Sequence, residues 1–300
     1  MLCRIAEKVT DKEVFGVNTY IMKLCGVGLS LIIMSWMVAG VSNARLTGPE
    51  LLEAAVAIWT FEKTERNKGH DPFVKDDSGN GHDAVMVNAP ALVNGQFGKA
   101  VEFNAGRKNY LEVPHHEDFD LDEEISISVW VKRPPRLQAL DIAPYFIVEK
   151  GGEWQHGRPT FGIALHKVFN NMFYFWYKGG FQAVKGIKDD QWHHYVVVAK
   201  DGERDPAMYI DGELKEVETR DGQRVIALEP SPGRALHIGA ALPERFDSWT
   251  NNTIDDLAIF NVALSQADVE RLGRGIDNSI FAVSPLAKLT TTWAALKQNR

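Results

Sequence analysis

The sequence predicts an all-β protein, folded as an antiparallel β-sandwich or barrel with one short helix near its C-terminal end. Short segments rich in β-branched and aromatic residues recur between residues 53 and 260, among them VAIWTF, SISVWV, MFYFWY and HHYVVVA. Turn sequences such as SGNG, NGQFG, KGG and DGE separate them. No long helical pattern lies between these segments, which argues against the alternating βαβ units of a parallel sheet.

The segments differ in how many of their faces are apolar. In SISVWV, Ile127 and Val129 point to one face, whereas Ser128 and Trp130 point to the other. Residues 196–198 are three consecutive valines, so this segment is apolar on both faces. Such a run is typical of a central strand that is covered on both sides.

Two adjacent histidines lie in the stretch QWHHYVVVAKDGERDPAMYIDGEL, residues 191–214. Neighbouring residues of a strand point to opposite faces, so His193 and His194 cannot bind one metal ion from the same face. Asp211 and Gly212 form a two-residue turn of the kind that closes tight hairpins, because glycine tolerates positive φ. The stretch therefore predicts a meander of strands, in which both histidines have structural roles.

The helix signals come late in the chain. SQADVERL, residues 265–272, begins with Ser265 as a helix N-cap and has Asp268 three residues on, near a capping-box arrangement. A tail, residues 276–300, contains LTTTWAALKQ with apolar residues at helical spacing. This tail is expected to be partly helical, and either docks on the sandwich or serves as a spacer or partner-binding segment.

The N-terminus resembles an export signal. Residues 26–44 form an apolar run with a lysine before it and small residues at its end, as at a signal-peptidase site. We expect residues 1–44 to be a signal peptide, with Met22 as a second candidate for the start of translation; a membrane anchor is the alternative. The protein is then secreted, extracellular or in the cell envelope. Both cysteines, Cys3 and Cys25, lie in this leader, so the mature chain would have no disulfide.

The composition limits the classes of function that are possible. The chain has 300 residues, 45% hydrophobic and 24% charged, with a formal net charge of -7. This balance is typical of a globular protein. No basic block stands out, so the sequence has no electrostatic signature of nucleic-acid binding. No membrane partner is expected beyond the N-terminal segment.

Several motifs occur in the order of one known family. They are WTFEKT (59–64), DDSGNGHDA (76–84), NGQFGKAVEFN (94–104), SISVWVKRP (126–134), residues 191–214 and TIDDLAIFNVALSQADVERL (253–272). Together they resemble the laminin G-like jelly-roll domains of the concanavalin A-like lectin/glucanase superfamily. The resemblance implies one jelly-roll domain over residues 53–275.

Catalytic motifs are missing from the sequence. Glycosidases of this superfamily carry paired carboxylates in a Glu-x-Asp-x-(x)-Glu pattern on one strand, and no segment here has it. There is also no Gly-x-Ser-x-Gly elbow, zinc-type cysteine pairing or phosphate loop. We therefore expect no catalytic residues and no enzyme activity.

Calcium is the one cofactor that the resemblance implies. Related domains often bind a structural Ca²⁺ ion where the first strand, the Ser-Gly-Asn loop and the closing Ile-Asp strand meet. Matched by motif, the ligands would be Glu62, Asp76, Asn80 and Asp255. Alternatively, Asp76 and Asn80 only cap a turn and Asp255 only binds backbone amides. The acidic stretch 115–124 fails the EF-hand pattern and is expected to be a solvated loop, held to the core by Phe119 and Leu121.

Aromatic residues outside the family motifs are the candidates for ligand binding. Trp154 and Trp249 lie in polar loops, and Trp176 shares one strand face with Tyr174. Each could contact a ligand or simply fill the sandwich. The sequence thus predicts a secreted, noncatalytic binding module whose partner is a glycan. The alternatives are an adhesion or scaffold domain that binds an extracellular protein, and an enzyme with an unfamiliar site.

Overall fold

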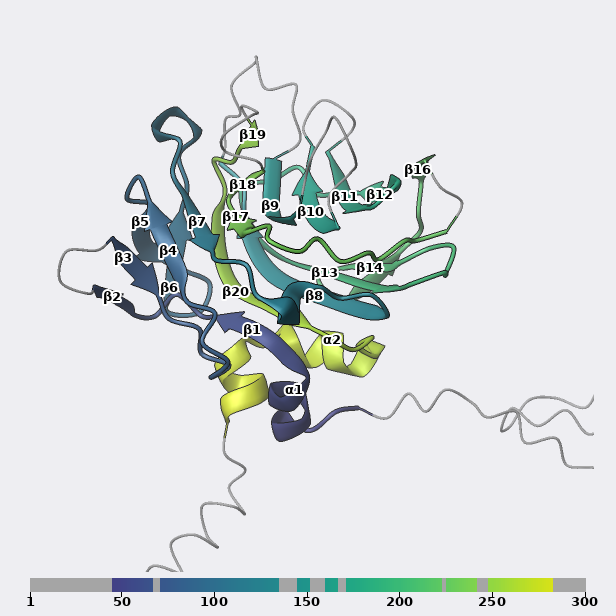
Figure 1. Ribbon diagram of the computed structural model, residues 1–300, viewed down its shortest axis with the longest axis horizontal. Coiled ribbons are helices and arrows are strands. Elements are labelled where there is room, and N and C mark those ends of the chain that lie inside the picture. Colours follow the sequence, from purple (N-terminus) through teal and green to yellow (C-terminus); the bar gives the residue numbers. More distant parts are fainter. Residues whose placement is uncertain are drawn as a thin grey trace, which may run out of the picture. The chain divides into compact units, whose positions relative to one another are not determined.

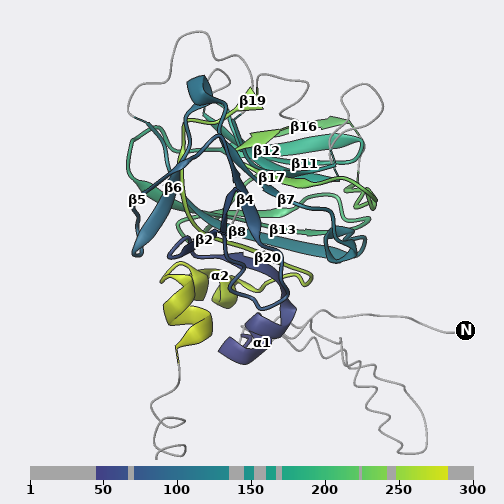
Figure 2. The same cartoon turned by 60° about the vertical axis from the view of Figure 1, so that its left-hand side comes forward.

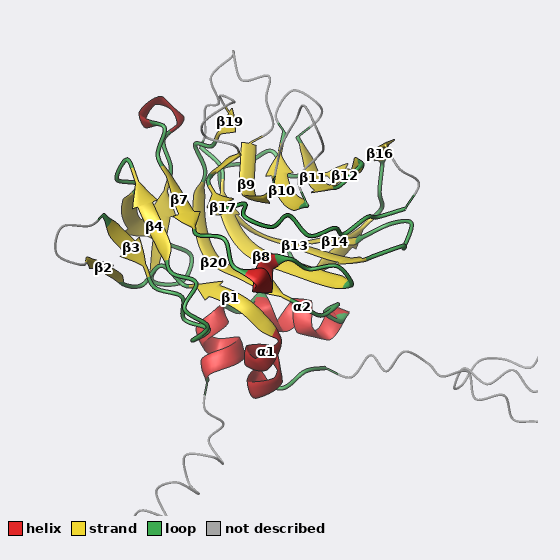
Figure 3. Cartoon of the chain, in the orientation of Figure 1, coloured by secondary structure: helices red, strands yellow, loops and turns green. Residues whose placement is uncertain are grey.

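Two antiparallel β-sheets stack face to face in the computed structural model (Figure 1). The structure describes residues 45–66, 71–134, 145–151, 160–166, 171–222, 225–241 and 248–282. All of them belong to the unit Asn43–Arg300. The predicted antiparallel sandwich is confirmed, and strands dominate the described chain, with the α-helices gathered beyond one sheet (Figure 3).

The first sheet has eight strands and contains both the beginning and the end of the domain. Its order is β15-β14-β13-β8-β20-β6-β5, and β1 also pairs with β20. The strands are β1 Ala55–Trp59, β5 Ala91–Asn94, β6 Lys99–Glu102, β8 Glu124–Lys132, β13 Trp192–Lys200, β14 Ala207–Ile210, β15 Glu213–Lys215 and β20 Thr253–Phe260.

The second sheet has ten strands, in the order β16-β12-β11-β10-β9-β17-β7-β4-β3-β2. A short ribbon, β18 Ala240–Ala241 with β19 Ser248–Trp249, is paired separately. The strands of the second sheet are β2 Thr64–Arg66, β3 Pro72–Val74, β4 Ala84–Val87, β7 Tyr110–Val113, β9 Tyr145–Lys150, β10 Phe161–Leu165, β11 Met172–Tyr177, β12 Gly180–Lys185, β16 Thr219–Gly222 and β17 Leu236–Ile238.

The main core fills the space between the two sheets. Strand alternation divides β11 as expected, because Phe173, Phe175 and Tyr177 all belong to this core. Trp59 is fully buried in it. Trp130 and Trp192, the tryptophans of two other family motifs, are only partly buried.

A second apolar layer covers the outer side of the eight-stranded sheet. Figure 2 shows α1 Gly48–Ala54 and α2 Gln266–Leu272 beside each other beneath β1 and β20. The short helix η3 Asp277–Phe281 packs with them. Val196 and Val198 face this layer, whereas Val197 faces the main core, so the prediction of a strand covered on both sides is confirmed.

Both α-helices begin with a capping box. In α2, Ser265 and Asp268 form the predicted capping box. In α1, Thr47 and Glu50 form another one, which the sequence analysis missed. This helix has seven residues and only two that are fully buried, so it carries no long apolar period that a sequence could show.

The meander over residues 192–215 is present as predicted. The turn between β14 and β15 has Asp211 at φ 55° and Gly212 at φ 79°, which is the left-handed conformation of a tight hairpin turn. His194 is buried, and its Nε2 lies 2.8 Å from Ser128 Oγ. His193 contacts Asp211 and Asp189 at 2.7 and 2.8 Å. The two histidines thus have separate partners.

Among the described residues, no helix is long and apolar enough to cross a membrane. The predicted signal peptide, residues 1–44, lies outside the described residues, and so do both cysteines. The same holds for residues 283–300 of the predicted tail.

Two short 3-10 helices complete the described chain, η1 Ala105–Arg107 and η2 Glu117–Phe119. Phe119 is fully buried and Leu121 packs against the main core, as expected for the anchors of the acidic stretch.

Candidate functional site

The ten-stranded sheet has an outer face that turns away from the main core. Strand register places six of its residues in one line across six strands, and we call this line the outer row. It runs through Glu112 on β7, His237 on β17, Glu149 on β9, Gly162 on β10, Trp176 on β11 and Phe181 on β12. Acidic, histidine and aromatic side chains from well-separated parts of the sequence thus become neighbours.

The polar half of the outer row consists of one histidine between two carboxylates. His237 Nε2 lies 3.7 Å from Glu112 Oε2, and His237 Nδ1 lies 3.5 Å from Glu149 Oε2. Glu149 is 1% exposed, whereas the Glu112 side chain is 42% exposed. The Tyr110 ring packs edge-on against His237, with a centroid distance of 5.7 Å. A ligand approaching this face therefore meets Glu112, His237 and Tyr110 first.

The aromatic half surrounds Trp176. Its ring lies 4.6 Å from Phe181 and 6.0 Å from both Tyr174 and Phe146, measured between centroids. At Gly162, a Cβ atom would lie 3.2 Å from the Val148 carbonyl oxygen and 3.4 Å, an ordinary contact distance, from the Phe146 ring. These rings form a cluster separate from the main core. The predicted division of β11 into two aromatic faces is thereby confirmed.

The three predicted ligand-binding tryptophans have different outcomes. Trp154 lies outside the described residues. Trp176 is only 7% exposed, and so is Trp249, which packs against Tyr110 at 5.6 Å and has Lys108 Nζ 5.9 Å from its ring centroid. Both thus lie on the outer face, but as buried support and not as the exposed platform expected of a lectin.

The polar half of the outer row was not predicted from the sequence. Its three members come from three separate strands, each an ordinary-looking segment: YLEV, YFIVEK and LHI. Only the register between β7, β17 and β9 brings them together. One signal was available in the sequence: Glu149 is a polar residue at an outward position of the otherwise apolar segment YFIVEK.

Two of the four predicted calcium ligands, Asp76 and Asn80, make hydrogen bonds within and around a turn. The Asp76 carboxylate accepts hydrogen bonds from the backbone amides of Ile58, Ser78 and His82 at 2.9–3.0 Å, and from Ser78 Oγ at 2.8 Å. Asn80 Nδ2 donates to the carbonyls of Ala55 and Val56. The alternative interpretation, in which Asp76 and Asn80 cap a turn, describes these contacts.

The other two candidates lie farther along the strands, beside the hairpin that joins β5 to β6. Glu62 Oε1 accepts from the Lys99 amide at 2.7 Å, and Asp255 Oδ2 accepts from the Phe97 amide at 2.8 Å. Asn80 contacts the start of β1, whereas Asp255 lies beyond its end, since Trp59 pairs with Leu257. Asn80 and Asp255 thus contact different ends of β1, and the four-residue ligand set stays a prediction.

Asp255 and Asp256 form a buried acidic pair at a bulge in β20. Asp256 has φ 47°, and its Oδ2 accepts from the Ile276 amide at 2.7 Å. Burial, with a contribution from Asp256, raises the pKa of Asp255 to about 8. Burial also raises the pKa of Asp256 to about 7, helped by Asp277, Glu62 and Asp77. Asp255 Oδ1 is buried and has no hydrogen-bond partner in the described part of the chain.

Known proteins resemble this chain in sequence pattern and in fold. A family model described as the concanavalin A-like lectin/glucanases superfamily matches residues 105–270, more than half of the chain. A comparison with curated proteins finds no match.

Among solved structures, domain 4 of AbnA, a GH43 extracellular arabinanase from Geobacillus stearothermophilus in complex with arabinotriose, is 20% identical, with a TM-score of 0.51. The similarity covers 73% of this chain and 98% of that one. The binding domain of botulinum neurotoxin DC in complex with SialylT is 14% identical, with a TM-score of 0.52, over 75% of this chain and 52% of that one.

A sialidase from Trypanosoma rangeli is 15% identical, with a TM-score of 0.51, over 77% of this chain but only 34% of the sialidase. At these identities the similarity concerns the fold, and the superfamily contains both enzymes and binding proteins. The motif order, the two stacked sheets and the family match agree with one another. This chain belongs to the concanavalin A-like lectin/glucanases superfamily.

Proposed function

We propose that this chain is a noncatalytic carbohydrate-binding module, exported through its N-terminal segment. The observation that carries the proposal is the polar half of the outer row, where Glu112 and His237 lie beside the Tyr110 ring on one sheet face. Ligand sites commonly combine aromatic walls with a few placed polar groups. The half-exposed Glu112 and the neighbouring His237 would bind sugar hydroxyls, and the Tyr110 ring would cover an apolar sugar face. Export rests on the apolar run of residues 26–44.

The position of His237 supports binding rather than hydrolysis. Glycosidases place two carboxyl groups on either side of the scissile bond, about 5–9.5 Å apart, and leave the space between them for the substrate. Here the imidazole ring of His237 contacts both Glu112 and Glu149 and takes up that space. A sugar could contact this row from above but could not lie between the two carboxylates.

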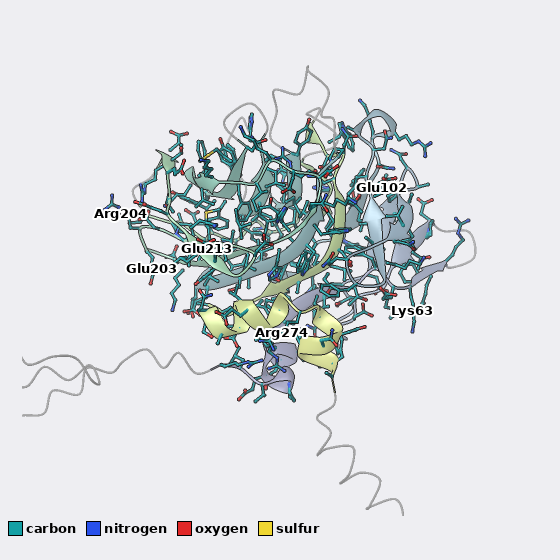
Figure 4. The ribbon with its side chains drawn as sticks, turned by 180° about the vertical axis from the view of Figure 1, so that it is seen from behind. Lys63, Glu102, Glu203, Arg204, Glu213 and Arg274 are labelled. Carbon is teal, nitrogen blue, oxygen red and sulfur yellow. The ribbon has the colours of Figure 1, made fainter. Side chains whose placement is uncertain are left out.

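The described surface gives less support to a protein partner. Such a partner would use a contiguous apolar patch, yet Leu214 and Val225 are the only exposed large hydrophobic residues in the described ranges. Charged side chains such as Glu203, Arg204 and Glu213 point outward around the rim of the eight-stranded sheet (Figure 4). A glycan site on the opposite sheet fits this polar surface better.

A glycan array probed with the full chain tests the proposal. We expect saturable binding to a related group of glycans, and a loss of about tenfold or more in affinity for His237→Gln, corresponding to about 1.4 kcal/mol. His193→Gln is a matched control, because His193 also contacts two carboxylates but lies on the other sheet. Wild-type protein that binds no glycan, or equal losses in both variants, would contradict the proposal.

We also propose a structural Ca²⁺ ion at Asp255. The support is its buried Oδ1 atom, which has no hydrogen-bond partner in the described part of the chain, and the repulsion between Asp255 and Asp256, whose own neighbours include Glu62, Asp77 and Asp277; a divalent cation would compensate this repulsion. Asp255 and Glu62 are the residues that would hold the ion, which would tie the β5–β6 hairpin to β20. Calcium titration by calorimetry should show one site that Asp255→Asn abolishes. Asn80→Ala should bind calcium like the wild type, because Asn80 contacts the start of β1 and not the β5–β6 hairpin.

A further inference from the structure

A second group of potential metal ligands lies at the edge of the ten-stranded sheet, far from Asp255 in the sequence. His82 follows the SGNG turn, whereas His116 and Asp118 belong to the acidic stretch around η2. One ligand atom from each of the three residues lies within 4.8 Å of the other two. The acidic stretch, which fails as an EF-hand, thus meets a histidine from another loop.

Two of the three separations between these atoms are close to those of ligands around one small ion, and the two histidine nitrogens lie within 4.8 Å of each other. His82 Nε2 lies 2.9 Å from Asp118 Oδ2, and His116 Nδ1 lies 3.2 Å from the same oxygen. Zinc binds histidine nitrogen and carboxylate oxygen at about 2.0–2.2 Å, so two ligands of a tetrahedral site are about 3.3 Å apart. Both observed separations can reach that value through small movements of exposed side chains.

His82 is the fixed member of the group. It is 5% exposed, its amide donates to Asp76 Oδ2 at 3.0 Å, and its carbonyl accepts from Trp59 Nε1 at 2.9 Å. Its ring also packs against Phe119, with a centroid distance of 4.7 Å. Because backbone and ring are both held, the imidazole is already oriented toward Asp118 before any ion binds.

His116 is the adjustable member. Its side chain is 50% exposed, and its Nδ1 faces both the Asp118 amide at 3.3 Å and the Asp118 carboxylate at 3.2 Å. One nitrogen cannot accept from the first and donate to the second in the same protonation state. The ring is therefore not committed to one hydrogen bond and can turn so that a nitrogen faces an ion.

A cavity of about 320 Å³ adjoins the group, and its lining includes His82, His116, Asp83 and the apolar residues Phe73 and Val85. Three protein ligands leave the fourth position of a tetrahedral ion unfilled. Because two of the three ligands line the cavity, that position would be reached from it by water or by a small anionic or neutral ligand.

We propose that His82, His116 and Asp118 bind one divalent transition-metal ion of the Zn²⁺ type, with a fourth coordination position open to the adjoining cavity. Two imidazoles and one carboxylate favour such an ion over calcium, which prefers six to eight oxygen ligands. The contrast with His193 is informative: its two carboxylate partners lie on opposite ring nitrogens, so they cannot join it around one ion.

The test uses the full chain without an affinity tag, carrying Cys3→Ser and Cys25→Ser so that no thiol competes for the metal. Calorimetric titration with Zn²⁺ should show one ion per chain, and Co²⁺ should give the visible absorption of a tetrahedral site. His116→Ala and Asp118→Asn should each weaken zinc binding by about 100-fold or more, because even the loss of a partner behind a ligand costs about 10–100-fold. Both side chains are largely exposed, so the fold should persist.

His115→Ala is the matched control. His115 is adjacent in sequence and lines the same cavity, but its ring nitrogens face Lys150 Nζ at 3.4 Å and Asp120 Oδ2 at 3.9 Å. This variant should bind zinc like the parent protein. The proposal is overturned if the parent protein binds no zinc, if His116→Ala and Asp118→Asn bind it unchanged, or if His115→Ala loses binding to the same degree. Asp255→Asn should leave zinc binding intact, which separates this site from the proposed calcium site.

Discussion

Replacing Asp255 by asparagine should remove a pH-dependent cost from the stability of the fold. The native pKa of Asp255 is raised to about 8, whereas an unfolded aspartate titrates near 3.9. Between these values the native chain binds a proton that the unfolded chain does not. The free energy of unfolding therefore falls as the pH rises, by about 1.4 kcal/mol per pH unit for this group.

Between pH 5 and pH 7, this carboxyl group should lower the free energy of unfolding of the wild type by up to about 3 kcal/mol. The free energy of unfolding of Asp255→Asn should not show this decrease. Urea unfolding, followed by tryptophan fluorescence in the presence of a chelator, measures the difference between the two proteins at each pH. Titrating groups that do not interact with Asp255 are shared and cancel in this difference, whereas its neighbour Asp256 does interact with it. The groups nearest to the pair, Glu62, Asp77 and Asp277, remain unchanged in the variant.

Asp205→Asn provides the control for this experiment. Asp205 is a surface carboxylate bound by Arg220, and this hydrogen bond lowers its pKa, so it is ionised in both states from pH 5 to pH 7. Its replacement should shift the stability without changing the slope against pH. Parallel slopes for the wild type and Asp255→Asn would refute the reasoning. With saturating calcium at pH 7, the wild type alone should gain about 2.7 kcal/mol at a hundred times the dissociation constant.

Three further substitutions test the fold. Phe175→Ala empties a fully buried position of the main core and should cost about 3–5 kcal/mol in urea unfolding; a loss below about 1 kcal/mol would show that this ring is not tightly packed. Burial lowers the pKa of His194 to about 4, so the wild type should lose up to about 3 kcal/mol as the pH falls from 6.5 to 4.5, and His194→Gln should not. Equal acid sensitivity of the two would contradict this. Gly212→Ala places a Cβ atom at φ 79° and should lower stability by about 1 kcal/mol in thermal unfolding, whereas an unchanged midpoint would argue against the left-handed turn.

The sequence was informative where a local pattern determines the structure. The capping box of α2, the Asp211–Gly212 turn and the alternation of β11 each depend on a few adjacent residues, and each is present. The acidic stretch was also placed correctly, because Phe119 is the apolar residue that anchors it.

The sites depend on strand register, which local patterns do not encode. Glu112, Glu149 and His237 become neighbours only because β17 lies between β7 and β9. His82 and Asp118 are 36 residues apart and meet through two loops. The four calcium candidates depend on register in the same way, because matching motifs in order does not show how far apart their side chains lie along a strand.

The pairing of β20 has a consequence for how the chain folds. This last strand lies between β8 on one side and β6 and β1 on the other, so it joins three strands that are made much earlier. At about 5–20 residues per second, the ribosome needs on the order of ten seconds between Lys132, which ends β8, and Phe260. During that time β8 has an unpaired edge, whereas the local hairpins of β9 to β12 can already form. A chain truncated before residue 253 would keep that edge open and should aggregate through it.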